Sequence, residues 1–139
     1  MSDKQRPDIS KKNPYWLERH RYYELKHFCL QYPIWKKARA EIEGLVRTHY
    51  EPAFSFYTGE PSDPTFSAIE RRLYFTNRIE MVEKTSYDTD PVIGRYILKG
   101  VTEGLSYDVL NAGERVPCCK DIYYELYRRF FWLLDKVRK

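Results

Sequence analysis

The stretch 90-DPVIGRYILKGVTEGLSYDVLNAGERVPCCKDIYYELYRRFFWLLDKVRK-139 contains the clearest helix boundaries of the chain and decides its predicted fold. Asp90 followed by Pro91 is typical of a helix start. Aspartate caps the first turn, and proline lacks only an N–H group that would have no partner there. Apolar residues then recur at helical spacing as far as Gly104, where glycine favours the end of the helix. The tail is therefore predicted to begin with a capped helix.

Two further helices are predicted in the tail. Ser106 can cap a short helix over Tyr107–Ala112, which Gly113 ends. Residues 114–117 form a turn, and a long helix is expected over about Cys118–Arg138. A short helix, a turn and a longer basic helix follow one another in the order of a helix-turn-helix. A three-helix bundle of unrelated function would show the same order, so the pattern leaves both open.

The last helix is expected to divide into an apolar face and a basic face. Ile122, Leu126, Phe130 and Leu133 recur at helical spacing and predict the buried stripe, which Tyr123, Leu134 and Val137 widen. The segment Arg115–Lys139 holds seven Lys and Arg against three Asp and Glu, a net charge of +4 that equals that of the whole chain. A basic, aromatic-rich helix face attracts DNA phosphates. The residues predicted to bind DNA are Lys120, Tyr124, Tyr127, Arg128, Arg129 and Arg115.

The predicted DNA-binding residues differ in role along the helix. Lys120 and Tyr124 lie in its N-terminal half, which contacts base edges in a recognition helix, whereas Arg128 is better placed for phosphate. Asp121 and Glu125 oppose this interpretation because DNA repels carboxylates. They must point aside or accept hydrogen bonds from cytosine amino groups.

Composition limits the class of protein without fixing its function. The 139 residues suffice for one domain or two small helical subdomains, and 42% hydrophobic residues can bury a core. Tyrosine is abundant, with 13 residues, and suits both shallow cores and binding surfaces. The formal net charge of +4 permits nucleic-acid binding but does not require it.

Cysteine usage and hydropathy predict the compartment. The three cysteines, Cys29, Cys118 and Cys119, are odd in number and include a vicinal pair, which favours a reduced, cytoplasmic protein. No apolar run approaches the roughly 20 residues of a membrane span, and no signal peptide is recognisable at the N-terminus. We therefore expect no membrane partner.

The remainder of the chain is also predicted to be helical. Residues 1–13 form a flexible arm, and Asn13 with Pro14 starts a helical hairpin over 14–49 that breaks at Pro33. Residues 50–63 form a loop rich in Pro, Gly and Ser. A helical bundle over 64–139 completes an all-α fold of five or six helices, with the helix-turn-helix-like unit at its end.

Motifs for catalysis and cofactor binding are absent from the sequence. There is no Walker loop, no H-E-x-x-H and no G-x-S-x-G. His20 and His27 share a helix face with Cys29 close by, but a zinc site requires three or four ligands. Cys118 and Cys119 begin a helix, which acidifies thiols, yet no base or metal is placed beside them. We expect no enzyme, no cofactor and no metal.

The tail 95-RYILKGVTEGLSYDVLNAGERVPCCKDIYYELYRRFFWLLDK-136 resembles phage and prophage proteins of Gram-positive bacteria. These are late-gene transcription regulators of the ArpU and RinA type, which are similar to the DNA-binding region 4 of sigma factors. The resemblance rests on a helix that ends in E-G-x-S-Y, a turn, and a Tyr/Arg-rich helix with a large apolar run over Tyr123–Leu134. It departs at Pro117 and the Cys118–Cys119 pair, where such regulators often carry a Ser or Thr cap. It also departs in a less basic recognition helix, which holds Asp121 and Glu125.

Two hypotheses of function follow. The first is a DNA-binding transcription regulator of a phage or prophage, acting in the cytoplasm of a bacterial host. It would bind double-stranded DNA with its tail and contact RNA polymerase, another protein or a second copy with its front helices. The second is a phage protein-interaction module that inhibits a host defence complex or RNA polymerase without sequence-specific DNA binding.

Overall fold

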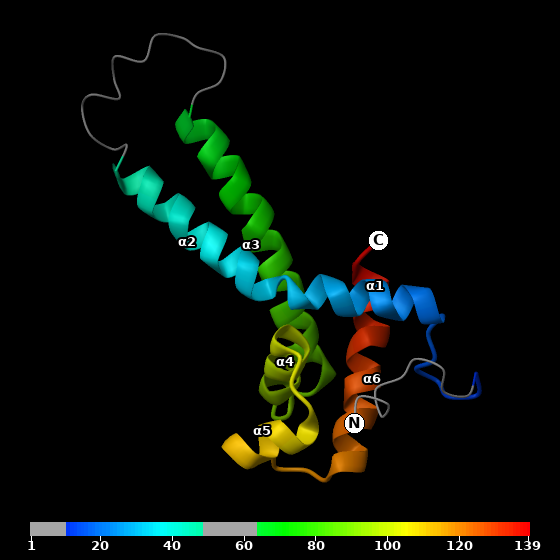
Figure 1. The fold of residues 1–139 in the computed structure, drawn as a ribbon. Coiled ribbons are helices and arrows are strands. Elements are labelled where there is room, and N and C mark those ends of the chain that lie inside the picture. The colour runs from blue at the N-terminus through cyan, green and yellow to red at the C-terminus, as the bar shows by residue number, and fades with distance from the viewer. Residues whose placement is uncertain (1–10, 49–63) are drawn as a thin grey trace. The chain divides into compact units, whose positions relative to one another are not determined.

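The computed structural model describes residues 11–48 and 64–139, which form helices with no strand among them (Figure 1). The predicted all-α fold is confirmed for this part of the chain. Residues 1–10 of the predicted arm and the predicted loop 50–63 lie outside the described residues. The helices are α1 (Arg19–Leu30), α2 (Tyr32–Thr48), α3 (Pro64–Thr89), α4 (Gly94–Glu103), α5 (Tyr107–Gly113) and α6 (Lys120–Val137).

The chain divides into two compact units. One contains residues 1–32 and 81–139, and the other contains residues 33–80. Helices α1 and α2 are separated by Gln31 alone, but the division falls directly after Tyr32, the first residue of α2, and also passes through α3. The units therefore differ from the predicted segments 14–49 and 64–139. The physical reason is that α1 packs with α4 and α6 of the tail.

The predicted caps of the tail are present. Asp90 Oδ1 accepts hydrogen bonds from the backbone N–H groups of Val92 and Ile93, both at 2.8 Å. A turn over residues 91–93 precedes α4, which begins at Gly94. Gly104 ends α4 with a φ of 71°, a conformation that glycine adopts without a Cβ penalty. Ser106 Oγ accepts from Val109 N at 3.3 Å and caps α5.

The predicted helix start at Asn13 and Pro14 is wrong. Asn13 Oδ1 accepts from Tyr15 N at 2.8 Å, which closes a local turn in competition with the helix. Helix α1 begins at Arg19 instead, where Glu18 Oε1 caps it by accepting from His20 N at 2.8 Å and from Arg21 N. Residues 11–18 consequently form an extended segment with turns.

The predicted apolar face of α6 is wrong in part. Phe130 of the stripe is fully buried, as are Tyr123 and Leu134 beside it. Ile122 and Val137 are 51% and 52% exposed, and Leu126 and Leu133 are partly exposed. Aromatic rings occupy the core positions in their place because they bury more apolar area than the aliphatic residues beside them. The buried residues of α6 are Tyr123, Tyr124, Tyr127, Phe130, Phe131 and Leu134.

An aromatic core joins α1, α5 and α6. The ring of Tyr22 on α1 lies 5.1 Å from that of Phe131, and Tyr127 lies 5.1 Å from Phe131 on its other side. Tyr123 continues the row, 6.1 Å from Tyr127 and 5.5 Å from Tyr107 on α5. Edge-to-face ring pairs add about 0.5–1.5 kcal/mol each to the burial of their area. The tyrosines of α6 therefore hold this unit together.

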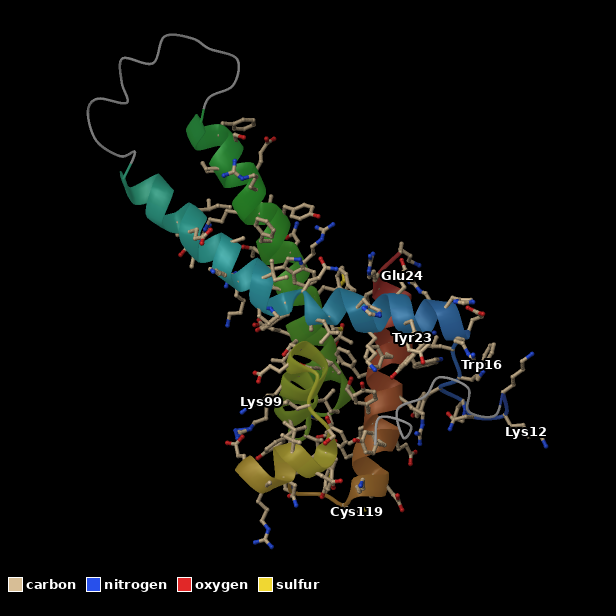
Figure 2. All side chains as sticks on the ribbon, in the orientation of Figure 1. Lys12, Trp16, Tyr23, Glu24, Lys99 and Cys119 are labelled. Atoms are coloured by element: carbon tan, nitrogen blue, oxygen red, sulfur yellow. The ribbon has the colours of Figure 1, made fainter. Side chains whose placement is uncertain are left out.

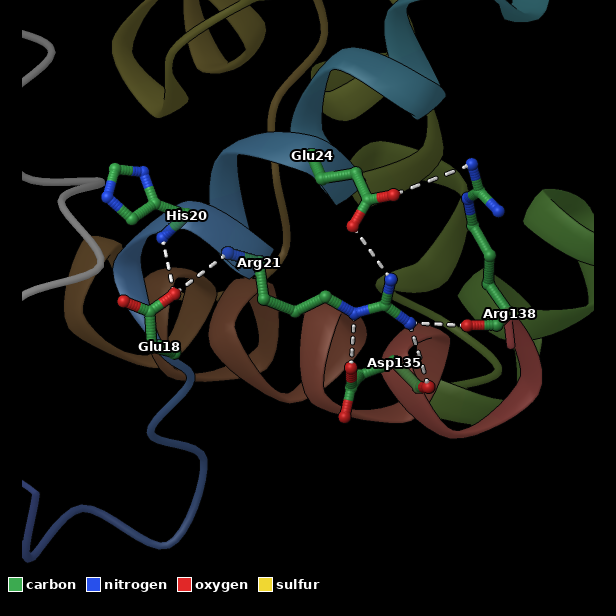
Figure 3. Close-up of polar contacts among 6 residues, drawn as sticks. All are labelled: Glu18, His20, Arg21, Glu24, Asp135 and Arg138. Atoms are coloured by element: carbon green, nitrogen blue, oxygen red, sulfur yellow. Dashed lines mark hydrogen bonds and ion pairs between the residues drawn. The ribbon is translucent and has the colours of Figure 1, made fainter.

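Arg21 on α1 forms an ion pair and hydrogen bonds with the C-terminal end of α6 (Figure 3). Its Nε lies 2.6 Å from Asp135 Oδ1, and its Nη1 lies 2.9 Å from Glu24 Oε1. Its Nη2 donates to the backbone oxygens of Asp135 and Arg138. Hydrogen bonds to the two carboxylates raise the pKa of Arg21. The end of α6 is thus held by a charged network in addition to the aromatic core.

Helix α2 and the first part of α3 pair in the second unit. Arg72 Nη2 lies 2.8 Å from Glu43 Oε2, and Arg39 Nη1 donates to Thr76 Oγ1 at 3.4 Å. The earlier residue of α2 contacts the later residue of α3, so the two helices run antiparallel. The buried hydrophobic side chains that these helices contribute within this unit are Trp35, Ile42, Ala68 and Ile79.

Candidate nucleic-acid interface

Helices α4, α5 and α6 pack on one another in the order of a helix-turn-helix. The hydroxyl of Tyr124 accepts a hydrogen bond from Tyr107 N at 3.0 Å, and the Tyr107 hydroxyl donates to Cys118 O at 2.6 Å. These two bonds join the first turn of α5 to α6 and to the turn that precedes it. The short helix is therefore held against the N-terminal half of the long one.

The close approach of α4 to α6 depends on Gly100. A Cβ at this position would lie 2.5 Å from the Tyr123 hydroxyl and 3.3 Å from the Leu105 carbonyl oxygen. The Tyr123 ring is fully buried, and burial raises the pKa of its hydroxyl. A side chain at residue 100 would thus displace the ring on which α4 and α5 pack.

Tyr124 and Tyr127 do not lie on the surface predicted for DNA contact. They are only 7% and 3% exposed, and burial raises the pKa of Tyr127 well above its ordinary value. Their rings lie 5.7 Å apart within the aromatic core. Only a helix phase centred on Ile122 would place both tyrosines on the outer face, and Ile122 is itself exposed. Their role is to position α5 and α6.

Lys120 and Arg115 lie at the N-terminal end of α6. Lys120 Nζ is 3.0 Å from Asp108 Oδ2 on α5, an ion pair that links the two helices of the motif. Arg115 is exposed in the turn that joins them. Lys120 therefore contributes to the docking of α5, while Arg115 is available for an anion.

Arg128 and Arg129 are half-buried in the middle of α6. Arg129 Nη1 lies 3.4 Å from the hydroxyl of Tyr15 in the segment before α1. The Nε of Arg128 is buried and has no hydrogen-bond partner among the described residues. The structure thus separates these two arginines from Lys120 by about two turns of helix.

Asp121, Ile122 and Glu125 form the exposed surface of the first turns of α6. The prediction that Ile122 lies in the core is wrong, and the two carboxylates share its exposed surface. A helix phase set by the aromatic residues would have found this surface, because Tyr123, Tyr127, Phe130 and Leu134 recur at spacings of three and four. A recognition helix would present these three residues to the bases.

The structure offers no metal-binding cluster within residues 11–48 and 64–139. His20 and His27 are exposed, whereas Cys29 is buried. Burial raises the pKa of Cys118, with Cys119 and Asp90 acting in the same direction, so the expected acidification is wrong for this thiol. In the same residues, no helix combines the length and the apolar character that a membrane crossing requires.

Comparisons with protein-family models, with curated proteins and with solved structures found no match to this chain.

Proposed function

We propose that the chain binds double-stranded DNA through α5 and α6, as a helix-turn-helix in which α6 enters the major groove. The observation that carries this proposal is the docking of the short α5 on the first half of α6 by Tyr107 and Tyr124. That docking leaves one face of the first turns of α6 exposed. The resemblance of the tail to late-gene regulators supports a role in transcription in a phage or prophage.

The exposed face defines which contacts to bases are chemically suitable. Asp121 and Glu125 are acceptors, and the major-groove donor of a G·C pair is the amino group of cytosine. Ile122 offers an apolar surface to the methyl group of thymine. Arg115, Arg128 and Arg129 supply the positive charge that offsets the two carboxylates and contacts phosphate. The protein would therefore recognise DNA sites through the carboxylate acceptors of Asp121 and Glu125, rather than through arginine side chains that donate to guanine.

Selection of duplexes from a random pool, followed by titration of each variant, tests this proposal. Glu125→Gln keeps the shape of the side chain and removes its charge. We expect it to bind random duplexes more tightly, because repulsion of phosphate is lost, and to discriminate less between selected and random duplexes by about 1–3 kcal/mol. The matched control is Glu103→Gln on the exposed surface of α4.

The expected behaviour of the control is no change in either affinity. A wild-type protein that enriches no sequence, or a Glu125→Gln variant with unchanged discrimination, would contradict base reading by this face. Circular dichroism of both variants shows whether the helices are intact.

A specific observation favours protein interaction as a second function. In the second unit, Phe66, Ile69 and Leu73 follow one another on α3 at spacings of three and four, and each is more than half exposed. Such an apolar stripe on a helix is typical of a surface that binds another helix. RNA polymerase, a host defence complex or a second copy of the chain would be suitable classes of partner.

Sedimentation of the purified chain tests the simplest of these partners. If a second copy covers the stripe, Leu73→Glu shifts a dimer to a monomer, whereas Glu70→Lys, a charge change next to the stripe, leaves the dimer in place. A wild-type protein that is monomeric throughout the accessible concentration range would exclude the second copy.

A further inference from the structure

The segment that precedes α1 is packed against the C-terminal half of α6. The ring of Tyr15 lies 5.4 Å from that of Trp132 in an edge-to-face arrangement, and the Tyr15 hydroxyl accepts from Arg129 at 3.4 Å. The backbone is turned at this point by bonds to Asn13, whose Oδ1 accepts from Tyr15 N and whose O accepts from Trp16 N. The segment is therefore an ordered part of the surface around α6.

Two lysines of this surface lie over tryptophan rings. Lys136 Nζ is 4.1 Å from the centre of the Trp132 ring, and Lys11 Nζ is 5.5 Å from that of Trp16. Figure 2 shows Lys12 and Trp16 projecting beyond the start of α1. All three lysines are exposed. A cation over an aromatic face keeps its full charge, so this contact does not neutralise the surface.

Three carboxylates at the start of α1 and the end of α6 are engaged by other groups. Glu18 accepts from two backbone N–H groups at the start of α1. Asp135 is paired with Arg21, and Glu24 lies within 4.0 Å of both Arg21 and Arg138 (Figure 3). The positive charge of Lys11, Lys136 and Arg129 is therefore left for an anion from outside.

The proposed reading face and the basic surface lie on one side of α6. Asp121, Glu125, Arg129, Trp132 and Lys136 follow one another at spacings of four, four, three and four, which places them along a single helix face. With a rise of about 1.5 Å per residue, Arg129 lies roughly 11 Å from Ile122 along the axis. The major groove is about 12 Å wide, so its bordering phosphates are within reach of the second half of α6.

We propose that Lys11, Arg129 and Lys136 form a phosphate-binding surface that contacts the DNA backbone beside the groove occupied by the first half of α6. This inference rests on the proposed function, since it assumes that α6 faces duplex DNA. It assigns to the segment before α1 a role in affinity, because the docking of that segment through Tyr15 places Lys11 on the same surface as Arg129 and Lys136 of α6. The surface carries no sequence information and strengthens binding to all duplexes alike.

Salt-dependent titration of a double variant tests the inference. Lys11→Ala with Lys136→Ala removes two charges while leaving the Tyr15–Trp132 contact intact. Each lost phosphate contact makes the slope of log K against log salt shallower by about 0.9, so we expect a change of about 1.8 for selected and random duplexes alike. The matched control is Lys84→Ala with Lys99→Ala, which removes two exposed lysines of α3 and α4.

Three results separate the inference from the proposed function. If charge at these positions contacts phosphate, the Lys84→Ala, Lys99→Ala control keeps the wild-type slope of log K against log salt. The Lys11→Arg, Lys136→Arg variant then also has the wild-type slope. If the Lys11→Ala, Lys136→Ala variant binds DNA with the wild-type slope, the proposed phosphate-binding surface is refuted. DNA binding by α5 and α6 is not contradicted by that result. A wild-type protein that binds no duplex at 50 mM salt, a concentration at which phosphate contacts are strong, would overturn both.

Discussion

Replacement of Gly94 by alanine should destabilise the unit that contains α4, α5 and α6. Gly94 is the first residue of α4 and is buried against the end of α3. A Cβ at this position would lie 2.9 Å from the backbone carbon of Ser86 and closer still to its carbonyl oxygen. Because these are backbone atoms of a helix, they cannot rotate away as a side chain would. The substitution therefore forces α4 and the end of α3 apart.

The expected cost follows from two opposing effects. Overpacking of a core costs about 1–3 kcal/mol, and the upper end applies where rigid backbone blocks the new atom. Alanine is favoured over glycine within a helix by about 1 kcal/mol, which offsets part of this cost. The net destabilisation should be about 2 kcal/mol. That value is a large fraction of the stability of a small domain.

Urea unfolding followed by far-ultraviolet circular dichroism measures the effect. The matched control is Gly113→Ala at the end of α5, where a Cβ would meet nothing within 4 Å. We expect the midpoint of Gly94→Ala to fall, while that of Gly113→Ala stays at the wild-type value or rises slightly. Equal midpoints for Gly94→Ala and the wild type would refute the close packing of α4 on α3.

Three further predictions concern the tyrosine-rich core. Phe130→Ala should cost about 3–5 kcal/mol in urea unfolding, whereas Ile122→Ala should stay within about 0.5 kcal/mol; the reverse order would restore the helix phase inferred from sequence. Tyr124→Phe should lower the free energy of unfolding by about 1–3 kcal/mol, because Tyr107 N loses its hydrogen-bond acceptor. An unchanged urea midpoint would show that this hydrogen bond does not stabilise the fold. Burial raises the pKa of Tyr22 from 10.0 to about 12, so stability should be complete below pH 10 and fall by up to about 1.4 kcal/mol per pH unit towards pH 12. A flat stability profile over that window, measured by the same unfolding assay, would contradict the burial of this hydroxyl.

Helix ends in the tail could be predicted from sequence because they depend on local chemistry. Asp90 and Ser106 cap helices with their own side chains, and Gly104 adopts the left-handed conformation that few other residues tolerate. Asn13 has the same local chemistry but closes a turn instead. The difference at Asn13 arises because the following residues pack on α6 through Tyr15, a contact between residues distant in sequence.

The face of α6 could not be predicted because its sequence is apolar or aromatic on more than one side. Tyrosine is amphipathic, so Tyr124 and Tyr127 fit either a core or a binding surface. Neighbouring elements decide between the two: α5 supplies Tyr107 N for the Tyr124 hydroxyl, and α1 supplies Tyr22 beside Phe131. The candidate site is affected in the same way, because burial of the tyrosines leaves Asp121, Ile122 and Glu125 as the proposed reading face. Arg128 and Arg129 are half-buried at the border between the buried and the exposed face of α6, so the prediction for them depends less on the helix phase.

Titration of the intact chain with a labelled duplex over a series of salt concentrations tests the central claim most directly. If α5 and α6 bind DNA through phosphate contacts, log K falls linearly with log salt, with a slope of about −0.9 for each contact. With Arg115, Arg128 and Arg129 in contact, the predicted slope is about −2.7 or steeper. Absence of saturable binding at 50 mM salt, where such contacts are strong, would contradict the claim.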